Sequence, residues 1–190
     1  MADLGVGDGG LLEQLSVLPL PWQFTGLDVS GDMLARAARR VSLTAVQAPA
    51  QQAAAHLPAA GFDLVLAHFI LAYVPRRQLF EQARQLVVPG GLFSLATSLV
   101  EGGEPLLHLM HGPLRRSWHP GRQLLGWLAR RGQSRSHVPA SYAELAAELA
   151  ATGWTVRHRQ TLRLPVRFGS GADLCRFVLD DGWGTNVLTI

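Results

Sequence analysis

Apolar residues along the first half of the chain fall into short runs separated by stretches with a helical period. Short apolar runs bounded by turn residues are typical of buried strands, and apolar residues three or four apart are typical of helices. The pattern predicts a first strand ending near Leu4 and later strands at Phe24–Val29, Leu43–Gln47, Phe62–Ala67 and Leu92–Thr97. It predicts helices beginning at Leu11, at about Asp32, after Ala48 and at Arg77. Strands that alternate with helices indicate an α/β fold with an open, mainly parallel sheet.

The pattern is weaker toward the end of the chain. Leucine and alanine lie on one helical face of Tyr142–Thr152, and Gly153 ends that predicted helix. Apolar and polar residues alternate along Trp154–Leu164, as is typical of an edge strand. Gly169–Gly171 predicts a turn, and Leu174–Leu179 fits either a short helix or a last strand.

Composition favours one domain, because 190 residues that are 48% hydrophobic can bury one core and are short for two. We expect binding motifs in residues 1–98, a basic insertion or lid in 99–140, and a helix with edge strands in 141–190. The longest apolar run, Leu64–Val74, is interrupted by His68 and is too short to span a bilayer. A single cysteine and the lack of a secretory pattern predict a cytoplasmic protein. All 17 basic residues are arginine, which we interpret as the coding bias of a bacterial source.

The clearest motif is Asp3-Leu4-Gly5-Val6-Gly7-Asp8-Gly9-Gly10. Closely spaced glycines let a strand turn sharply into a helix and bring backbone N–H groups close to a ligand. Gly5, Gly7 and Gly10 also satisfy G-x-G-x-x-G, so the glycines alone leave a dinucleotide and an adenosyl cofactor both open. Asp3 favours the second, because a dinucleotide loop usually has an apolar residue there, whereas a carboxylate suits a cofactor with an amino-acid ammonium group.

A second acidic residue, Asp28, ends the next predicted strand. A carboxylate there can accept both hydroxyls of a ribose, whichever cofactor carries it. Ligands of open parallel sheets bind at the carboxyl ends of the strands, where the strand order reverses. We therefore expect Asp3 and Asp28 to border one site.

Two later motifs complete an ordered series: the strand Phe62–Phe69, and the stretch Leu86–Phe93 with its Pro89-Gly90-Gly91 turn. From Asp3 to about Ser98 the chain resembles the S-adenosylmethionine-dependent class I methyltransferases, particularly the small-molecule branch that includes ubiquinone and menaquinone biosynthesis enzymes. The resemblance implies a Rossmann-like sheet with helices on both faces. It also implies S-adenosyl-L-methionine as the cofactor.

By this resemblance the cofactor site consists of Asp3, Gly5, Gly7, Gly9, Asp28, Val29, Met33, Ala50, Gln51, Ala67 and His68. The first four line the methionine part, and Asp28 holds the ribose. Val29 and Met33 are apolar neighbours of the ribose and adenine, although an ordinary core contact is an equal alternative for Met33. His68 follows the fourth strand, where the family contacts the methionine moiety or the acceptor, and a structural histidine is an equal alternative.

The chain departs from the family at two places. Pro49 stands where the family usually presents an aspartate to the adenine amino group, so Gln51 or the backbone of Ala50 would have to substitute. Only Met1 and Ala2 precede Asp3, whereas the family has one or two helices and a full first strand there. We therefore expect an N-terminally truncated chain with a shortened central strand, whose exposed sheet would favour a homo-oligomer.

The remaining histidines allow a base but no convincing metal site. His108 and His111 could share a helical face, but no carboxylate or cysteine lies at a suitable spacing, so we expect no metal. His111 or His119 is a candidate general base for a hydroxyl acceptor, with a solvated loop histidine as the alternative.

No acidic residue occurs from Pro105 to Ala143, a stretch rich in arginine, tryptophan and leucine. Such a segment can form a lid over an acceptor, bind an anionic membrane surface or RNA, or place a solvated arginine face over the core. A net charge of only +3 disfavours general nucleic-acid binding.

Together these features predict transfer of a methyl group from S-adenosylmethionine to a small organic acceptor whose reacting atom, oxygen, nitrogen or carbon, stays open. The alternative is a catalytically silent methyltransferase-like binding or partner subunit, which the short front and Pro49 favour.

Overall fold

A computed structural model describes residues 1–100, 137–162, 167–170, 172–173 and 176 of the chain. The chain divides into two compact units, Met1–Ser98 with His137–Thr155, and Leu99–Ser136 with Val156–Ile190. The first unit contains all the helices and strands discussed below.

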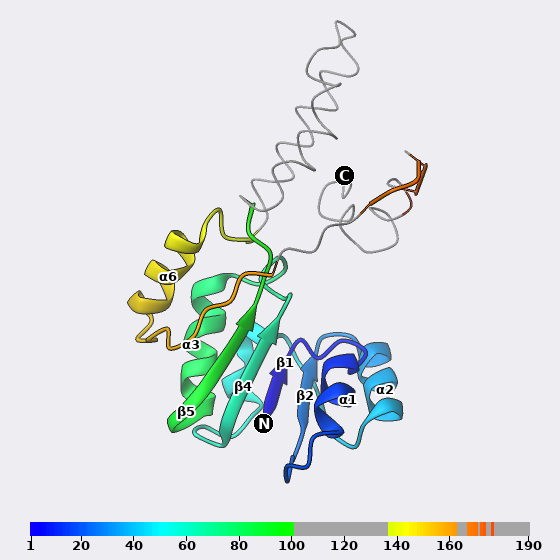
Figure 1. Ribbon diagram of the computed structural model, residues 1–190. Helices are drawn as coiled ribbons and strands as arrows, with labels where there is room; N and C mark the ends of the chain where they lie inside the picture. Colours follow the sequence, from blue (N-terminus) through cyan, green and yellow to red (C-terminus); the bar gives the residue numbers. More distant parts are fainter. Residues whose placement is uncertain (101–136, 163–166, 171, 174–175, 177–190) are drawn as a thin grey trace, which may run out of the picture. The chain divides into compact units, whose positions relative to one another are not determined.

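The first unit is built on a five-stranded sheet in the order β3-β2-β1-β4-β5 with every pair parallel (Figure 1). The strands are β1 Ala2–Leu4, β2 Thr25–Asp28, β3 Thr44–Gln47, β4 Phe62–His68 and β5 Val87–Ala96. The helices are α1 Gly10–Ser16, α2 Gly31–Arg40, η1 Ala50–Ala55, α3 Arg76–Leu86 and α6 Tyr142–Ala151. The chain order reverses between β1 and β4, so the expected switch point lies at the end of β1.

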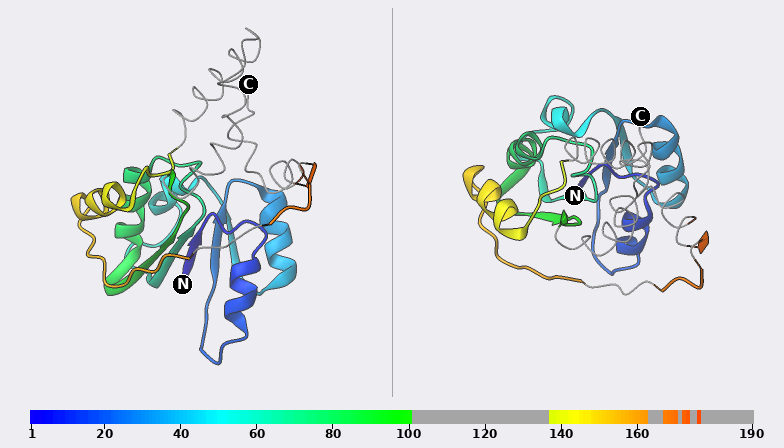
Figure 2. Two further views of the ribbon diagram at one scale, coloured as in Figure 1. Left: turned by 45° about the horizontal axis from the view of Figure 1, so that its top comes forward. Right: turned by 90° about the horizontal axis from the view of Figure 1, so that it is seen from above.

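The two faces of the sheet carry separate apolar clusters, because alternate residues of a strand point to opposite faces. Ala2, Leu4, Val65 and Ala67 pack with η1, α3 and α6 on one face. Met1 and Leu66 pack with Leu12 of α1 and with Leu34 and Ala37 of α2 on the other. Figure 2 shows these helices on the two sides of the sheet, as expected for a doubly covered α/β sheet.

Local sequence explains where the longer helices begin and end. The Ser30 hydroxyl caps α2 by accepting from the Met33 N–H at 3.3 Å, and Arg39 and Arg40 occupy its last turn. Ser141 caps α6 by accepting from the Glu144 N–H. Gly153 follows α6 with a φ of +82°, a conformation that favours glycine.

The start of β5 differs from the prediction, which placed it at Leu92. The helix ends at Leu86, and β5 already begins at Val87. The pairing shifts register between Phe62 and Leu64, so the predicted Pro-Gly-Gly turn is a bulge inside the strand. Val87 pairs with Phe62 before the bulge, which the sequence pattern of β5 did not reveal.

The predicted edge strand is wrong over Trp154–Leu162, none of which is in a strand. Side-chain alternation supplies no hydrogen-bonding partner, and a strand needs one. Trp154 instead donates its indole N–H to the Phe80 carbonyl at 3.2 Å. In the second unit, Ser170 and Asp173 exchange hydrogen bonds at a short turn. Leu174 and Cys175 lie outside the described residues.

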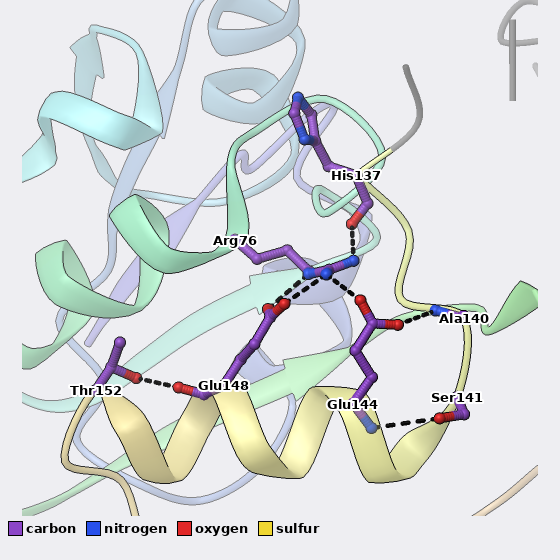
Figure 3. A network of polar contacts seen from close by, with 7 residues as sticks. All are labelled: Arg76, His137, Ala140, Ser141, Glu144, Glu148 and Thr152. Carbon is purple, nitrogen blue, oxygen red and sulfur yellow. Dashed lines mark hydrogen bonds and ion pairs between the residues drawn. The ribbon is translucent and has the colours of Figure 1, made fainter. Parts of the chain in front are cut away.

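Arg76, at the start of α3, joins α6 to the rest of the first unit (Figure 3). Its guanidinium donates to both carboxylate oxygens of Glu148, to Glu144 and to the backbone carbonyl of His137. Glu144 also accepts from the Ala140 N–H at 2.6 Å. We call this set the Arg76 network. It fixes both the entry to α6 and the body of that helix.

Candidate functional site

The loop after β1 has the left-handed backbone that its glycines predict. Gly5, Gly7 and Gly9 have φ values of +86°, +56° and +80°. The N–H groups of Gly5 and Val6 both donate to the Leu27 carbonyl, at 2.7 and 3.1 Å. The loop is thereby tied to the end of β2 before it enters α1, which Gly9 precedes as N-cap.

Two of these glycines meet different surroundings. A Cβ at Gly9 would lie 2.8 Å from the Ala37 Cα, so this glycine allows the loop to pack against α2. A Cβ at Gly7 would have no atom within 4 Å. Close packing explains Gly9, whereas open space beside Gly7 leaves room for a ligand to approach the backbone.

Asp28, at the end of β2, holds the glycine loop through its side chain. One carboxylate oxygen accepts from the Gly7 N–H and the other from the Ser30 N–H, each at 2.9 Å. A carboxylate offers about four acceptor positions, so each oxygen can accept a further hydrogen bond. The sequence predicted a ribose-binding role for Asp28 and did not reveal this structural role in holding the loop.

Asp3, in the central strand β1, is 3% exposed, and its Oδ1 makes no hydrogen bond within the described part of the chain. Burial, with a smaller contribution from the negative charge of Asp28, raises the pKa of Asp3 to about 6. An unpaired buried carboxylate oxygen is costly unless a partner satisfies it. Asp3 is therefore suited to receive a cation or another hydrogen-bond donor.

Two large apolar residues next to Asp28 are exposed. Val29 is 65% exposed and Met33, in the first turn of α2, is 37% exposed. A core contact for Met33 is therefore not what the structure shows. Gln47, at the end of β3, donates to the Val29 carbonyl at 3.1 Å and fixes the backbone here.

The loop after β3 carries the two residues expected near an adenine. Pro49 is the N-cap of η1, Ala50 is buried and Gln51 is partly exposed. No carboxylate occupies position 49, as the sequence already shows.

His68 and Ala67 end β4 on opposite faces of the sheet. Ala67 packs in the cluster with η1 and α3. His68 is partly buried, its Nε2 lies 2.9 Å from the Ser94 Oγ of β5, and burial lowers its pKa. Phe69, the next residue, is 70% exposed with a φ of +57°, and its N–H donates to the Ala96 carbonyl at 2.8 Å. Positive φ is rare in a bulky residue and marks a strained position.

The register of the sheet brings these side chains to one face. Asp3 pairs with Gly26 on one side and with Leu66 on the other, and Leu66 pairs with Ser94. Two residues further along, Asp28 and His68 lie in the next row, on either side of β1. Strands are about 4.8 Å apart, so Asp28 and His68 flank the glycine loop at a backbone separation of about 10 Å.

Two expected features cannot be placed. His108, His111, His119 and the arginine-rich segment lie outside the described residues.

Among the residues that are described, no three His, Cys, Asp or Glu side chains form a group able to hold a metal ion. Nor does any helix of the described segments have the length and apolar character needed to cross a membrane.

Ser94 and the strained Phe69 are features that sequence analysis missed. Ser94 carries no motif, and only the pairing of β5 with β4 brings its hydroxyl to His68. Ser94 lies on the same face as Leu66 because the two residues are paired. This register depends on the bulge between Phe62 and Leu64, which the sequence pattern does not reveal.

Comparison with known proteins identifies the fold. Residues 2–93 match the family model described as a methyltransferase domain. No curated protein matches the chain. Among solved structures, an S-adenosylmethionine-dependent methyltransferase from Mesorhizobium loti is 26% identical with a TM-score of 0.57, over 83% of this chain and 74% of that one.

Two further structures are more distant. Phosphoethanolamine N-methyltransferase 2 from Haemonchus contortus, solved with S-adenosyl-L-methionine, is 21% identical with a TM-score of 0.55, over 80% of this chain and 32% of that one. The cyclase SpnF is 19% identical with a TM-score of 0.55, over 80% of this chain and 49% of that one. The sheet order, the covering helices and these neighbours identify the α/β Rossmann-like fold of class I methyltransferases.

Proposed function

We propose that this chain, whose residues 2–93 match the methyltransferase-domain family, transfers a methyl group from S-adenosylmethionine to a small organic acceptor. The methyltransferase neighbours, one of them solved with this molecule, support the cofactor. The observation in the chain itself that carries the proposal is the buried, unpaired Oδ1 of Asp3, in the strand that leads into the glycine loop, together with the open space at Gly7 in that loop. A cofactor that ends in an ammonium group supplies the missing donor.

The residues at the strand ends fit the rest of this cofactor. Asp28 has acceptor positions left for the ribose hydroxyls after binding Gly7 and Ser30. Exposed Val29 and Met33 offer an apolar surface to the ribose and adenine, and the loop with Ala50 and Gln51 borders the adenine. The residues that we assign to cofactor binding are Asp3, Gly5, Gly7, Gly9, Asp28, Val29, Met33, Ala50, Gln51 and Ala67. For His68, which the sequence prediction also included, we propose the alternative role of contacting the acceptor.

When bound, S-adenosylmethionine supplies a methyl group on a positively charged sulfur, which is reactive toward an aligned nucleophile. The protein's task is to hold the two reactants in line and to exclude water. Asp28 links β2 to the glycine loop, so it fixes the position of the loop that binds the cofactor. We also propose that the acceptor is of the ubiquinone or menaquinone type. A further part of the proposal is that residues 1–190 form one methyltransferase domain.

The second candidate function is a catalytically silent binding subunit. It is favoured by Pro49, which removes the expected carboxylate near the adenine. The likeness to a cyclase also illustrates that the fold does not determine the reaction. Both candidates predict a folded domain, but only the enzyme needs a productive cofactor site.

Calorimetry with S-adenosylhomocysteine and S-adenosylmethionine tests the proposal. We expect binding, and we expect Asp28→Ala to lose about 2–4 kcal/mol, well over tenfold in affinity, because two charge-assisted hydrogen bonds are removed. Asp28→Asn keeps one acceptor oxygen and should lose less. A thermal melt of each variant separates loss of binding from loss of the loop's anchor.

Asp63→Ala is the matched control, because Asp63 is an exposed aspartate near the opposite end of β4. It should bind both cofactors as the wild type does. Binding of NAD without either adenosyl compound would contradict the proposal. Binding of the adenosyl compounds without methyl transfer to any acceptor would favour the silent subunit.

A further inference from the structure

His68 and Ser94 form a polar pair on the sheet face that also carries Asp3. The pair joins β4 to β5 near the carboxyl ends of the strands: Ser94 is paired with Leu66, and His68 lies two residues beyond Leu66 on β4. Leu66 packs in the cluster with Val6 and Leu12, so this face is the one from which the glycine loop enters α1. The imidazole therefore lies at the edge of the proposed cofactor site.

The two nitrogens of His68 have different surroundings. Nε2 lies 2.9 Å from the Ser94 Oγ. Nδ1 has no hydrogen-bond partner in the described part of the chain, and it is not among the fully buried polar atoms. If Nε2 carries the proton and donates a hydrogen bond to the Ser94 Oγ, the lone pair of Nδ1 is free to accept a proton.

Burial supports a neutral imidazole. The pKa of His68 is lowered by desolvation, with no charged partner contributing. The ionisable side chains that neighbouring strands place on this face are Asp3 on β1 and Asp28 on β2. Asp28 is held by Gly7 and Ser30, and Asp3 is buried. A neutral histidine is the form that can accept a proton at physiological pH.

We propose that Nδ1 of His68 accepts the proton of an acceptor hydroxyl group, and that Ser94 is the positioning residue that holds the proton on Nε2. The inference rests on the proposed function and deepens it by naming the acceptor class. The acceptor's O–H bond breaks and its proton moves to Nδ1, leaving an imidazolium. An electron pair of the oxygen forms the new bond to the methyl carbon. The bond between the methyl carbon and sulfur breaks, and its two electrons stay on sulfur. The imidazolium then returns its proton to water.

The next residue indicates what carries the hydroxyl. Phe69 is 70% exposed directly after His68, in a strained conformation held by its hydrogen bond to Ala96. An exposed aromatic side chain on the residue that follows the proposed base favours an aromatic body on the acceptor, since aromatic rings stack on or edge against one another. The inferred acceptor class is therefore a phenol-type hydroxyl compound.

Nitrogen-15 NMR of the histidine rings tests the pair without requiring turnover. With S-adenosylhomocysteine present, His68 should carry its proton on Nε2 and titrate below the usual histidine range. Ser94→Ala should mix the two tautomers, and Ser94→Thr should restore the single one. Ser16→Ala, the same change at a hydroxyl that donates to Glu13 at the far end of α1, should leave the spectrum unchanged. A proton on Nδ1 in the wild type overturns the proposal, as does an unchanged spectrum in Ser94→Ala.

A methyl-transfer assay tests the acceptor class with a panel of phenols, benzylamine and thiophenol as probes. Phenols should be methylated, with an acidic limb in the pH profile that moves in Ser94→Ala. His68→Gln keeps a donor toward Ser94 but cannot accept the proton, so it should lower turnover of phenols by about 100-fold or more. Its affinity for S-adenosylhomocysteine should stay nearly unchanged.

The outcomes separate this inference from the proposed function. Failure to bind S-adenosylhomocysteine contradicts the proposed function, and the tautomer measurement on the free protein still decides the pair. Transfer to the amine or thiol alone, or to no probe while the cofactor binds, overturns the hydroxyl acceptor. A large loss of cofactor affinity in His68→Gln places His68 in cofactor binding instead.

Discussion

Arg76 and Glu148 form a two-pronged ion pair, although 72 positions separate them in the sequence. Nε donates to one carboxylate oxygen at 2.6 Å and Nη2 to the other at 2.5 Å. The Arg76 side chain is 16% exposed and that of Glu148 is 32% exposed. Together with the bonds to Glu144 and His137, this pair attaches α6 to α3 (Figure 3).

Replacing Arg76 by methionine should destabilise the first unit by about 1–3 kcal/mol, because two partly buried carboxylates lose their partner. Arg77→Met is a matched control on the next residue. Arg77 is 79% exposed and pairs with Glu81 within the same helix, so this change should cost at most about 0.5 kcal/mol. Urea unfolding measures both. Equal losses would show that the Arg76 network contributes no more than a surface ion pair.

Gly7→Ala and Gly9→Ala should fail in different ways. Both positions have positive φ, but only the new Cβ at Gly9 would collide with backbone, at 2.8 Å from the Ala37 Cα. Gly9→Ala should therefore lower stability by several kcal/mol, and Gly7→Ala by only about 1 kcal/mol. Gly7→Ala should nevertheless weaken S-adenosylhomocysteine binding, because its methyl group enters the open space proposed for the cofactor.

Gly90→Ala is the control for Gly7→Ala. Gly90 also has a positive φ, +82°, and a Cβ there would have no atom within 4 Å, but it lies in the β5 bulge. Thermal melts should show similar losses for the two variants, and calorimetry should show normal binding for Gly90→Ala. Normal binding by a folded Gly7→Ala protein would place the cofactor elsewhere.

Asp3→Asn should stabilise the cofactor-free protein at pH 7. The pKa of Asp3 is raised from 3.8 to about 6 in the folded state, so stability is lost as pH rises through that window. The shift corresponds to about 1–3 kcal/mol, and the gain in Asp3→Asn should be much smaller at pH 4 and vanish below it, as the carboxyl becomes neutral in both states. The same variant should bind S-adenosylhomocysteine more weakly, because the ammonium loses its charged partner.

Asp63→Asn is the corresponding control. Asp63 is exposed and interacts electrostatically with the N-terminal ammonium, so the change should cost at most about 0.5 kcal/mol and leave binding unchanged. Chemical denaturation at pH 4 and pH 7 measures the stability difference. A destabilised Asp3→Asn protein at pH 7 would indicate that the wild-type carboxylate has a partner in the free protein.

Pro49→Asp should increase selectivity for adenine. Without a carboxylate at position 49, the wild type should bind S-adenosylhomocysteine and S-inosylhomocysteine with similar affinity, because the exocyclic amino group meets no charged acceptor. Aspartate is a favourable N-cap for η1, so the change should not cost stability. A new hydrogen bond to that amino group is worth about 1 kcal/mol or somewhat more. Pro19→Asp, an exposed proline before β2, is the control. If the wild type binds S-adenosylhomocysteine much more tightly than S-inosylhomocysteine, Gln51 or the Ala50 backbone already binds the adenine amino group.

The sequence by itself determined the order of strands and helices and the placement of the glycine loop and Asp28, because these depend on local signals. Apolar period, helix caps and glycine spacing act over a few residues and need no knowledge of the partner strand. The same local character explains the errors. The alternation of Trp154–Leu162 looked like a strand, but no pairing follows from it, and the β5 bulge depends on pairing with β4.

Only the tertiary structure decided which side chains meet. Register across four strands brings Asp3, Leu66 and Ser94 into one row and places Asp28 and His68 in the next. Burial of Asp3, its unpaired oxygen and the contact between His68 and Ser94 follow from that register. The Arg76 network likewise joins residues from distant segments. These relationships depend on packing between elements, and a change of one residue in register would move each side chain to the opposite face.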